Sequence, residues 1–73
     1  MQSELFEGLI TVIRTSGAYT YIGKASVGSA TSDAVWQIKR FYKISTGNYD
    51  VKYAGGAPQL IKVFDDRATY TYS

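Results

Sequence analysis

Apolar and polar residues alternate along most of this chain, in short runs that end at glycine-containing turns. The clearest run is residues 34–44 (AVWQIKRFYKI), a pattern typical of a strand with one buried face. Because successive side chains of a strand point to opposite faces, every second residue shares a face. The face that we expect to be buried carries Trp36, Ile38, Arg40, Tyr42 and Ile44. Arg40 should lie near its edge, with a buried stem and a guanidinium group that needs a partner.

The runs on either side of residues 34–44 also predict strands. Residues 18–25 (AYTYIGKA) form one strand, with a loop over 26–33 before the next. Residues 45–48 (STGN) predict a hairpin loop, which leads into a strand over 49–54. A loop this short makes its two strands adjacent, so we expect their aromatic faces to pack together. The inward residues of the later strand would be Tyr49, Val51 and Tyr53.

Residues 5–14 fit two periodicities. Their apolar positions include a helical spacing, whereas Gly8 and the β-branched run at residues 11–13 favour a strand. We interpret the segment as a strand, and residues 1–14 as an arm that could cross between subunits by edge pairing. Its candidate interface residues are Leu5, Leu9, Ile10 and Val12.

The segment VFDDRATYTYS over residues 63–73 holds the nearest thing to a chemical motif. Adjacent carboxylates on a strand would point to opposite faces, and calcium loops need several spaced oxygen ligands. We therefore favour a structural corner over a metal site, with Arg67 pairing one of Asp65 and Asp66 while the other accepts backbone N–H groups. Residues 59–66 would form this irregular corner and 68–72 a closing strand. Tyr70 and Tyr72 would share one face of that strand, toward either the core or a neighbouring subunit.

Length and composition indicate a small all-β domain that is stabilised by association. A chain of 73 residues is one domain at most, and a core of this size supplies only about 3–5 kcal/mol. The sequence contains no cysteine and no histidine, so disulfides are excluded and a zinc site nearly so. We predict a single domain over residues 1–73, a small antiparallel barrel or sandwich of roughly five to six strands, and a homo-oligomer.

Several functional classes find little support in these residues. Without histidine the usual general base near neutral pH is missing, and we expect no enzyme, cofactor or small-molecule substrate. No apolar run approaches the length of a membrane span, and the N-terminus lacks the basic start of a secretory signal. The net charge of +2 is mild and dispersed, which argues against a nucleic-acid partner.

Three stretches resemble a group of short proteins encoded by tailed bacteriophages. They are TYIGKASVGSATSDAVWQIKR at residues 20–40, YAGG at 53–56 and FDDRATYTYS at 64–73. The group shares a Tyr-Ile-Gly-x-Ala strand, a Trp-x-Ile-x-Arg strand and a Trp/Phe-Asp-x-Arg segment followed by Tyr-Ser. This chain has Phe64 where tryptophan is expected and a longer N-terminal stretch. The resemblance implies phage origin and a virion component made in the host cytoplasm, and it carries over no catalytic residue.

We therefore expect a non-enzymatic structural protein of the virion that self-associates or docks on other virion proteins. Capsid decoration, tail and fibre components are the candidates. The alternative is a small β module that binds single-stranded nucleic acid or carbohydrate through exposed aromatics, since Lys39 and Lys43 share a face with Phe41 and Lys24 could lie nearby. A large assembly in high salt would favour the first, and salt-sensitive retention on single-stranded DNA the second.

Overall fold

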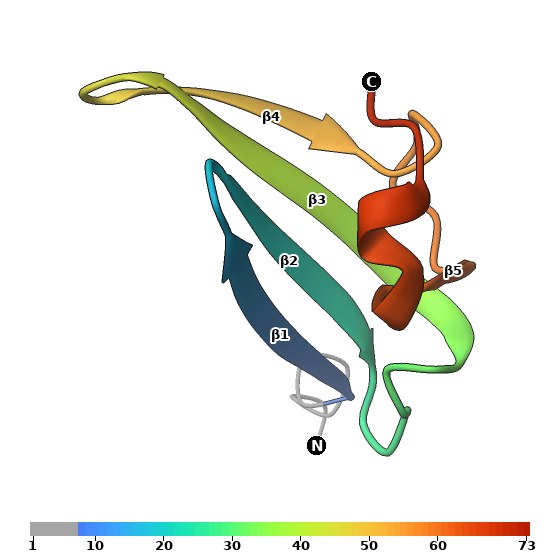
Figure 1. Cartoon of the computed structure of the whole chain (residues 1–73). Helices are drawn as coiled ribbons and strands as arrows, with labels where there is room; N and C mark the ends of the chain where they lie inside the picture. Colours follow the sequence, from blue (N-terminus) through green and yellow to red (C-terminus); the bar gives the residue numbers. More distant parts are fainter. Residues whose placement is uncertain (1–7) are drawn as a thin grey trace.

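The computed structural model describes residues 8–73, which form an antiparallel β-sheet with a short 3-10 helix packed on one face (Figure 1). The elements are β1 (Leu9–Ser16), β2 (Tyr19–Ser26), β3 (Ala34–Ser45), β4 (Asn48–Tyr53), β5 (Lys62–Val63) and the 3-10 helix η1 (Phe64–Thr69). The first four strands lie in the order β1-β2-β3-β4, and β5 pairs with the beginning of β3. The predicted all-β class is confirmed.

The N-terminal segment is a strand from Leu9 onward, and Gly8 before it lies in a turn. β1 runs from Leu9 to Ser16 and pairs antiparallel with β2 along its whole length, in a register that joins Val12 to Gly23. The helical alternative fails because Ile10 and Val12 face the core while Leu9 and Ile13 face away, a period of two. Leu5 lies outside the described residues.

The core fills the space between the sheet and the C-terminal segment. Trp36, Ile38 and Phe64 are its largest fully buried side chains, and the rings of Trp36 and Phe64 lie 5.4 Å apart. The other buried members are Tyr21, Ala25, Ala54 and Tyr72. Trp36 Nε1 donates a 2.8 Å hydrogen bond to the carbonyl of Ala30, so the indole is buried without an unpaired donor.

The absence of a side chain at Gly23 makes room for η1. A Cβ atom placed there would lie 2.5 Å from Phe64 Cδ1 and 3.0 Å from Trp36 Cε3. The distance to Phe64 is far inside van der Waals contact and the distance to Trp36 is tight, so the Phe64 ring packs directly on the backbone of β2.

The outer half of β3 is less covered than its alternation predicted. Trp36 and Ile38 are buried, but Tyr42 is 39% exposed and Ile44 is 58% exposed. The reason is length, because β3 and β4 extend as a hairpin beyond the region that η1 and the C-terminal segment cover (Figure 1). The expectation that this whole face is buried was therefore wrong for Tyr42 and Ile44.

The prediction that Tyr49, Val51 and Tyr53 face inward was also wrong. The β3–β4 register pairs them with Lys43, Phe41 and Lys39, which lie on the face opposite Trp36. Asp50 and Lys52, predicted to point outward, lie instead on the core side, opposite Tyr42 and Arg40. A register shift between Lys43 and Ser45 causes the difference, since one extra residue in a strand exchanges its two faces.

The predicted closing strand over residues 68–72 does not form. Ala68 and Thr69 end the 3-10 helix, and the only pairing of the final residues is an isolated antiparallel bridge between Tyr72 and Ala54. Gly55 N donates to Thr71 O at 2.8 Å, and Tyr53 and Ser73 exchange two backbone hydrogen bonds of 3.2 Å. The corner predicted over residues 59–66 corresponds to β5 and the start of η1.

Candidate functional site

Asp65, Asp66 and Arg67 lie within η1, where both aspartates are exposed and Arg67 is half-buried. Arg67 Nη1 donates a 3.2 Å hydrogen bond to the carbonyl of Phe64 rather than to an aspartate, and no side chain caps the helix. The predicted corner is present, but the predicted aspartate contacts are not. Among residues 8–73, no group of three His, Cys, Asp or Glu side chains lies close enough to hold a metal ion.

Arg40 is held between two tyrosine rings. Its guanidinium carbon lies 4.4 Å from the ring centre of Tyr19 and 4.5 Å from that of Tyr72, so both rings contribute cation–π attraction. Its Nε atom is buried and has no hydrogen-bond partner among the described residues. The expected partner of Arg40 is therefore a pair of aromatic faces instead of a carboxylate.

Tyr72 connects this cluster to the 3-10 helix and answers the question that the sequence left open. Its ring is buried against Tyr21, with ring centres 5.9 Å apart, and its hydroxyl donates a 2.6 Å hydrogen bond to Arg67 O. Tyr70 is half-buried, and its hydroxyl accepts a 2.9 Å hydrogen bond from Val63 N. Both tyrosines thus complete this chain's own core.

Burial raises the pKa of Tyr72 from 10.0 to about 12, and nearby Tyr21 adds to the rise while Arg40 opposes it. Because the folded state holds this proton more tightly than the unfolded state, the associated stability is intact below pH 10. It should be lost as pH rises from about 10 to about 12.

We expect this loss to appear in urea unfolding midpoints measured across that pH range. Tyr72→Phe should remove this part of the pH dependence. An equally steep decline in the Tyr72→Phe variant would contradict the assignment.

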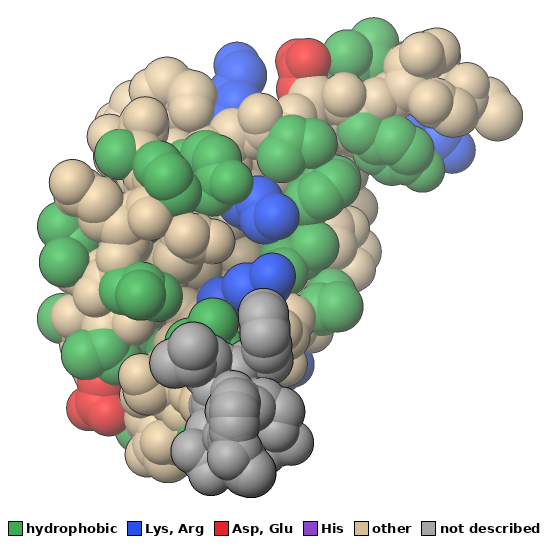
Figure 2. Space-filling view, turned by 180° about the vertical axis from the view of Figure 1, so that it is seen from behind, with side chains coloured by type: hydrophobic (Ala, Val, Ile, Leu, Met, Phe, Trp, Pro, Cys, Tyr) green, Lys and Arg blue, Asp and Glu red, His purple; other side chains and the backbone are tan. Residues whose placement is uncertain are grey.

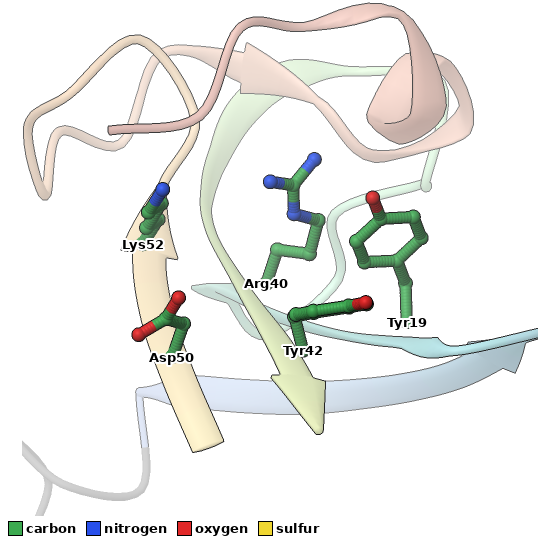
Figure 3. Close-up of a pocket in the computed structure, with 5 residues that line it drawn as sticks. All are labelled: Tyr19, Arg40, Tyr42, Asp50 and Lys52. Atoms are coloured by element: carbon green, nitrogen blue, oxygen red, sulfur yellow. The ribbon is translucent and has the colours of Figure 1, made fainter. Parts of the chain in front are cut away.

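A cavity of about 360 Å³ opens beside the Arg40 cluster, where the β3–β4 hairpin leaves the covered part of the sheet. Its lining residues are Tyr19, Arg40, Tyr42, Asp50 and Lys52 (Figure 3). Figure 3 shows that these side chains rise from β2, β3 and β4 on the side of the sheet that carries the C-terminal segment. The cavity combines two cations, one carboxylate and two phenol rings, and it contains no nucleophile–base pair.

The opposite side of the sheet, which we call the back face, has no described layer over it (Figure 2). Register and alternation assign its residues. Its apolar and aromatic members include Ile13, Ile22, Phe41, Tyr49, Val51 and Tyr53, and its charged members are Lys24, Lys39 and Lys43. Figure 2 shows lysine or arginine side chains among apolar ones in the middle of this face, and the described acidic side chains that are visible lie at its rim.

The edge of the sheet at β1 is a second open feature. β1 pairs with β2 on one side, and no strand of residues 8–73 pairs with its other side. Leu9 is 45% exposed and Ile13 is 55% exposed along this strand, and Arg14 is its one charged residue. Edge strands with so few charges and no proline are open to pairing with another chain.

The structure places the residues singled out from the sequence in three groups: the core, the edge strand β1 (from which Ile10 and Val12 pack against that core) and the surface of η1. Trp36, Arg40, Arg67, Tyr70 and Tyr72 join in or around one core, whereas Leu9, Ile10 and Val12 belong to the edge strand. Asp65 and Asp66 stand apart on the surface of η1. The alternation of β3 had already placed Lys39, Phe41 and Lys43 together. Tyr49 and Tyr53 were missed as their neighbours because the register shift could not be read from the sequence.

Comparison with known proteins found no relative of this chain. No family model, no curated protein and no solved structure matches the chain. No helix among the described residues is long and apolar enough to cross a membrane.

Proposed function

We propose that this chain is a non-enzymatic structural protein of a phage particle, which works by associating with copies of itself and with other virion proteins. The observation that carries the proposal is the outer edge of β1, which no strand of residues 8–73 pairs with and which exposes Leu9 and Ile13. The phage setting rests on the sequence resemblance alone. Capsid decoration, tail and fibre roles are all compatible with it.

Pairing through β1 would give this small fold stability that its own core does not supply. Two copies that align their β1 strands antiparallel about a two-fold axis would form one continuous sheet, to which each contributes its four main strands. Such pairing adds main-chain hydrogen bonds and covers apolar side chains of the edge. The fold has a small core and no disulfide, so association is the remaining source of extra stability.

We expect Ile13→Lys to weaken assembly about tenfold or more, equivalent to about 1.4 kcal/mol, because a charge on an edge strand opposes pairing. Light scattering after size exclusion in about 0.5 M salt, where surface charge attraction is screened, measures the effect. Ile44→Lys is the matched control, since Ile44 is as exposed (58% against 55%) but lies at the far end of β3. A wild-type protein that stays monomeric at high concentration, or an Ile44→Lys variant that dissociates equally, would refute the proposal.

A further inference from the structure

The fold separates the charges of this chain by face. Of the ionisable side chains on the strands, the back face carries Lys24, Lys39 and Lys43 and no described carboxylate. Asp50 lies on the core side of β4, and Asp65 and Asp66 lie on η1. A net charge of only +2 for the whole chain therefore conceals a face whose described charged side chains are all lysines.

Aromatic rings are interleaved with these lysines. Along β3 the order on this face is Lys39, Phe41, Lys43, and along β4 the facing residues are Tyr53, Val51 and Tyr49. Each of the two β3 lysines is thus paired across the strands with a tyrosine. Residues two apart on a strand are about 7 Å apart, so the rings and ammonium groups recur at regular short intervals.

We propose that the back face binds single-stranded nucleic acid, with bases stacked on Phe41, Tyr49 and Tyr53 and phosphates held by Lys24, Lys39 and Lys43. Surfaces that bind single strands combine a cationic track with aromatic rings in this way, and stacking needs no particular base. An open sheet suits bases that are already unstacked, whereas a duplex would present only its phosphates to the lysines.

The charges favour this occupant over a second copy of the chain. Two back faces packed about a two-fold axis would bring six lysines together with no described carboxylate between them, which opposes association. A polyanion is instead attracted by each of these lysines, and its binding to the back face does not require the β1 edge. The residues proposed to bind nucleic acid lie on β2, β3 and β4, whereas the proposed assembly edge is β1, so each proposal can fail without the other.

The test is fluorescence anisotropy with a labelled oligothymidylate of about 15 nucleotides, a length within the usual range for one small β domain. Three phosphate contacts predict a log–log salt slope of roughly −2, so affinity should fall about fifteen-fold between about 50 mM and about 200 mM NaCl. A duplex of equal length should bind more weakly. Lys39→Gln/Lys43→Gln should weaken binding and reduce the slope to roughly −0.7.

Two further variants separate stacking from charge. Phe41→Leu should weaken binding about tenfold with the salt slope unchanged, because it removes a ring and no charge. Lys52→Gln/Lys62→Gln removes the same charge from the other side of the molecule and should leave binding within about twofold of wild type.

The proposal is overturned by any of three outcomes. The wild type may fail to bind the oligonucleotide at about 50 mM NaCl, or the two double-lysine variants may lose equal affinity. The third outcome is that polyglutamate binds as well as the oligonucleotide while Phe41→Leu changes nothing, which would make the face a docking site for acidic protein. The oligonucleotide measurements all use chains that keep Ile13, because its side chain lies on the back face, and light scattering of Ile13→Lys tests the oligomeric state separately.

Discussion

Replacing Gly23 with alanine is expected to destabilise the fold by about 3 kcal/mol, near the upper end of overpacking effects. The added methyl group would stand 2.5 Å from Cδ1 and 2.7 Å from Cε1 of Phe64, a ring that is only 1% exposed and has little space to move into. Since domains of this size have about 5 kcal/mol of stability in total, much of the population should unfold on modest warming. Chemical denaturation followed by Trp36 fluorescence measures the loss.

A second substitution identifies the cause. In Gly23→Ala/Phe64→Leu the smaller side chain gives the methyl group room, so the double variant should be more stable than the sum of the single effects predicts. Gly17→Asn is the control, because Gly17 has φ +60 with nothing near its missing Cβ, a conformation that asparagine accepts. It should change stability by no more than about 0.5 kcal/mol. Simple additivity in the double variant would show that the contact is not the origin.

Tyr72→Ala is expected to cost about 3–5 kcal/mol, the range for deleting a buried aromatic ring. The ring packs on Tyr21 and covers one side of the Arg40 guanidinium at 4.5 Å, so its loss opens the core and removes one of the two rings that hold the cation. The same unfolding measurement reports this change.

Tyr72→Phe and Thr71→Ala divide the effect into its parts. Tyr72→Phe keeps the ring but leaves Arg67 O without its hydroxyl donor, which should cost about 1 kcal/mol. Thr71 is exposed, and the hydrogen bond it receives from Gly55 goes to its backbone oxygen, so Thr71→Ala should change stability by less than about 0.5 kcal/mol. If Tyr72→Ala cost no more than Thr71→Ala, Tyr72 would not belong to the core.

The sequence was informative wherever a residue's position depends on its near neighbours. Alternation alone located β3 and its buried Trp36 and Ile38, and the β-branched run identified β1 as a strand. It failed for β4, where Ser45 pairs with Asn48 but Lys43 pairs with Tyr49, leaving Ile44 as the extra residue. Such a bulge moves every following side chain to the opposite face of the sheet, and no residue type in the hairpin predicts it.

The C-terminal segment and the candidate surfaces depend on contacts between distant parts of the chain. Thr-Tyr alternation predicted a strand over residues 68–72, but Tyr72 is placed by Tyr21, Arg40 and Arg67, which its own neighbours in the sequence do not reveal. The back face likewise depends on three strands being brought into register, so that lysines spaced along the chain come together. Net charge and local periodicity contain no such information.

The order in which this chain is synthesised has a consequence for how it folds. Trp36 and Ile38 belong to the third strand, yet Phe64 and Tyr72, which cover them, leave the ribosome much later. Chains are synthesised at roughly 5–20 residues per second, so Phe64 and Tyr72 are added a few seconds after Trp36. During that time the indole of Trp36 is exposed to water or bound by a chaperone. Until then the nascent chain can form only a single β-sheet with both faces exposed to solvent. Stable folding of this domain therefore requires that the 3-10 helix and Tyr72 have already been synthesised.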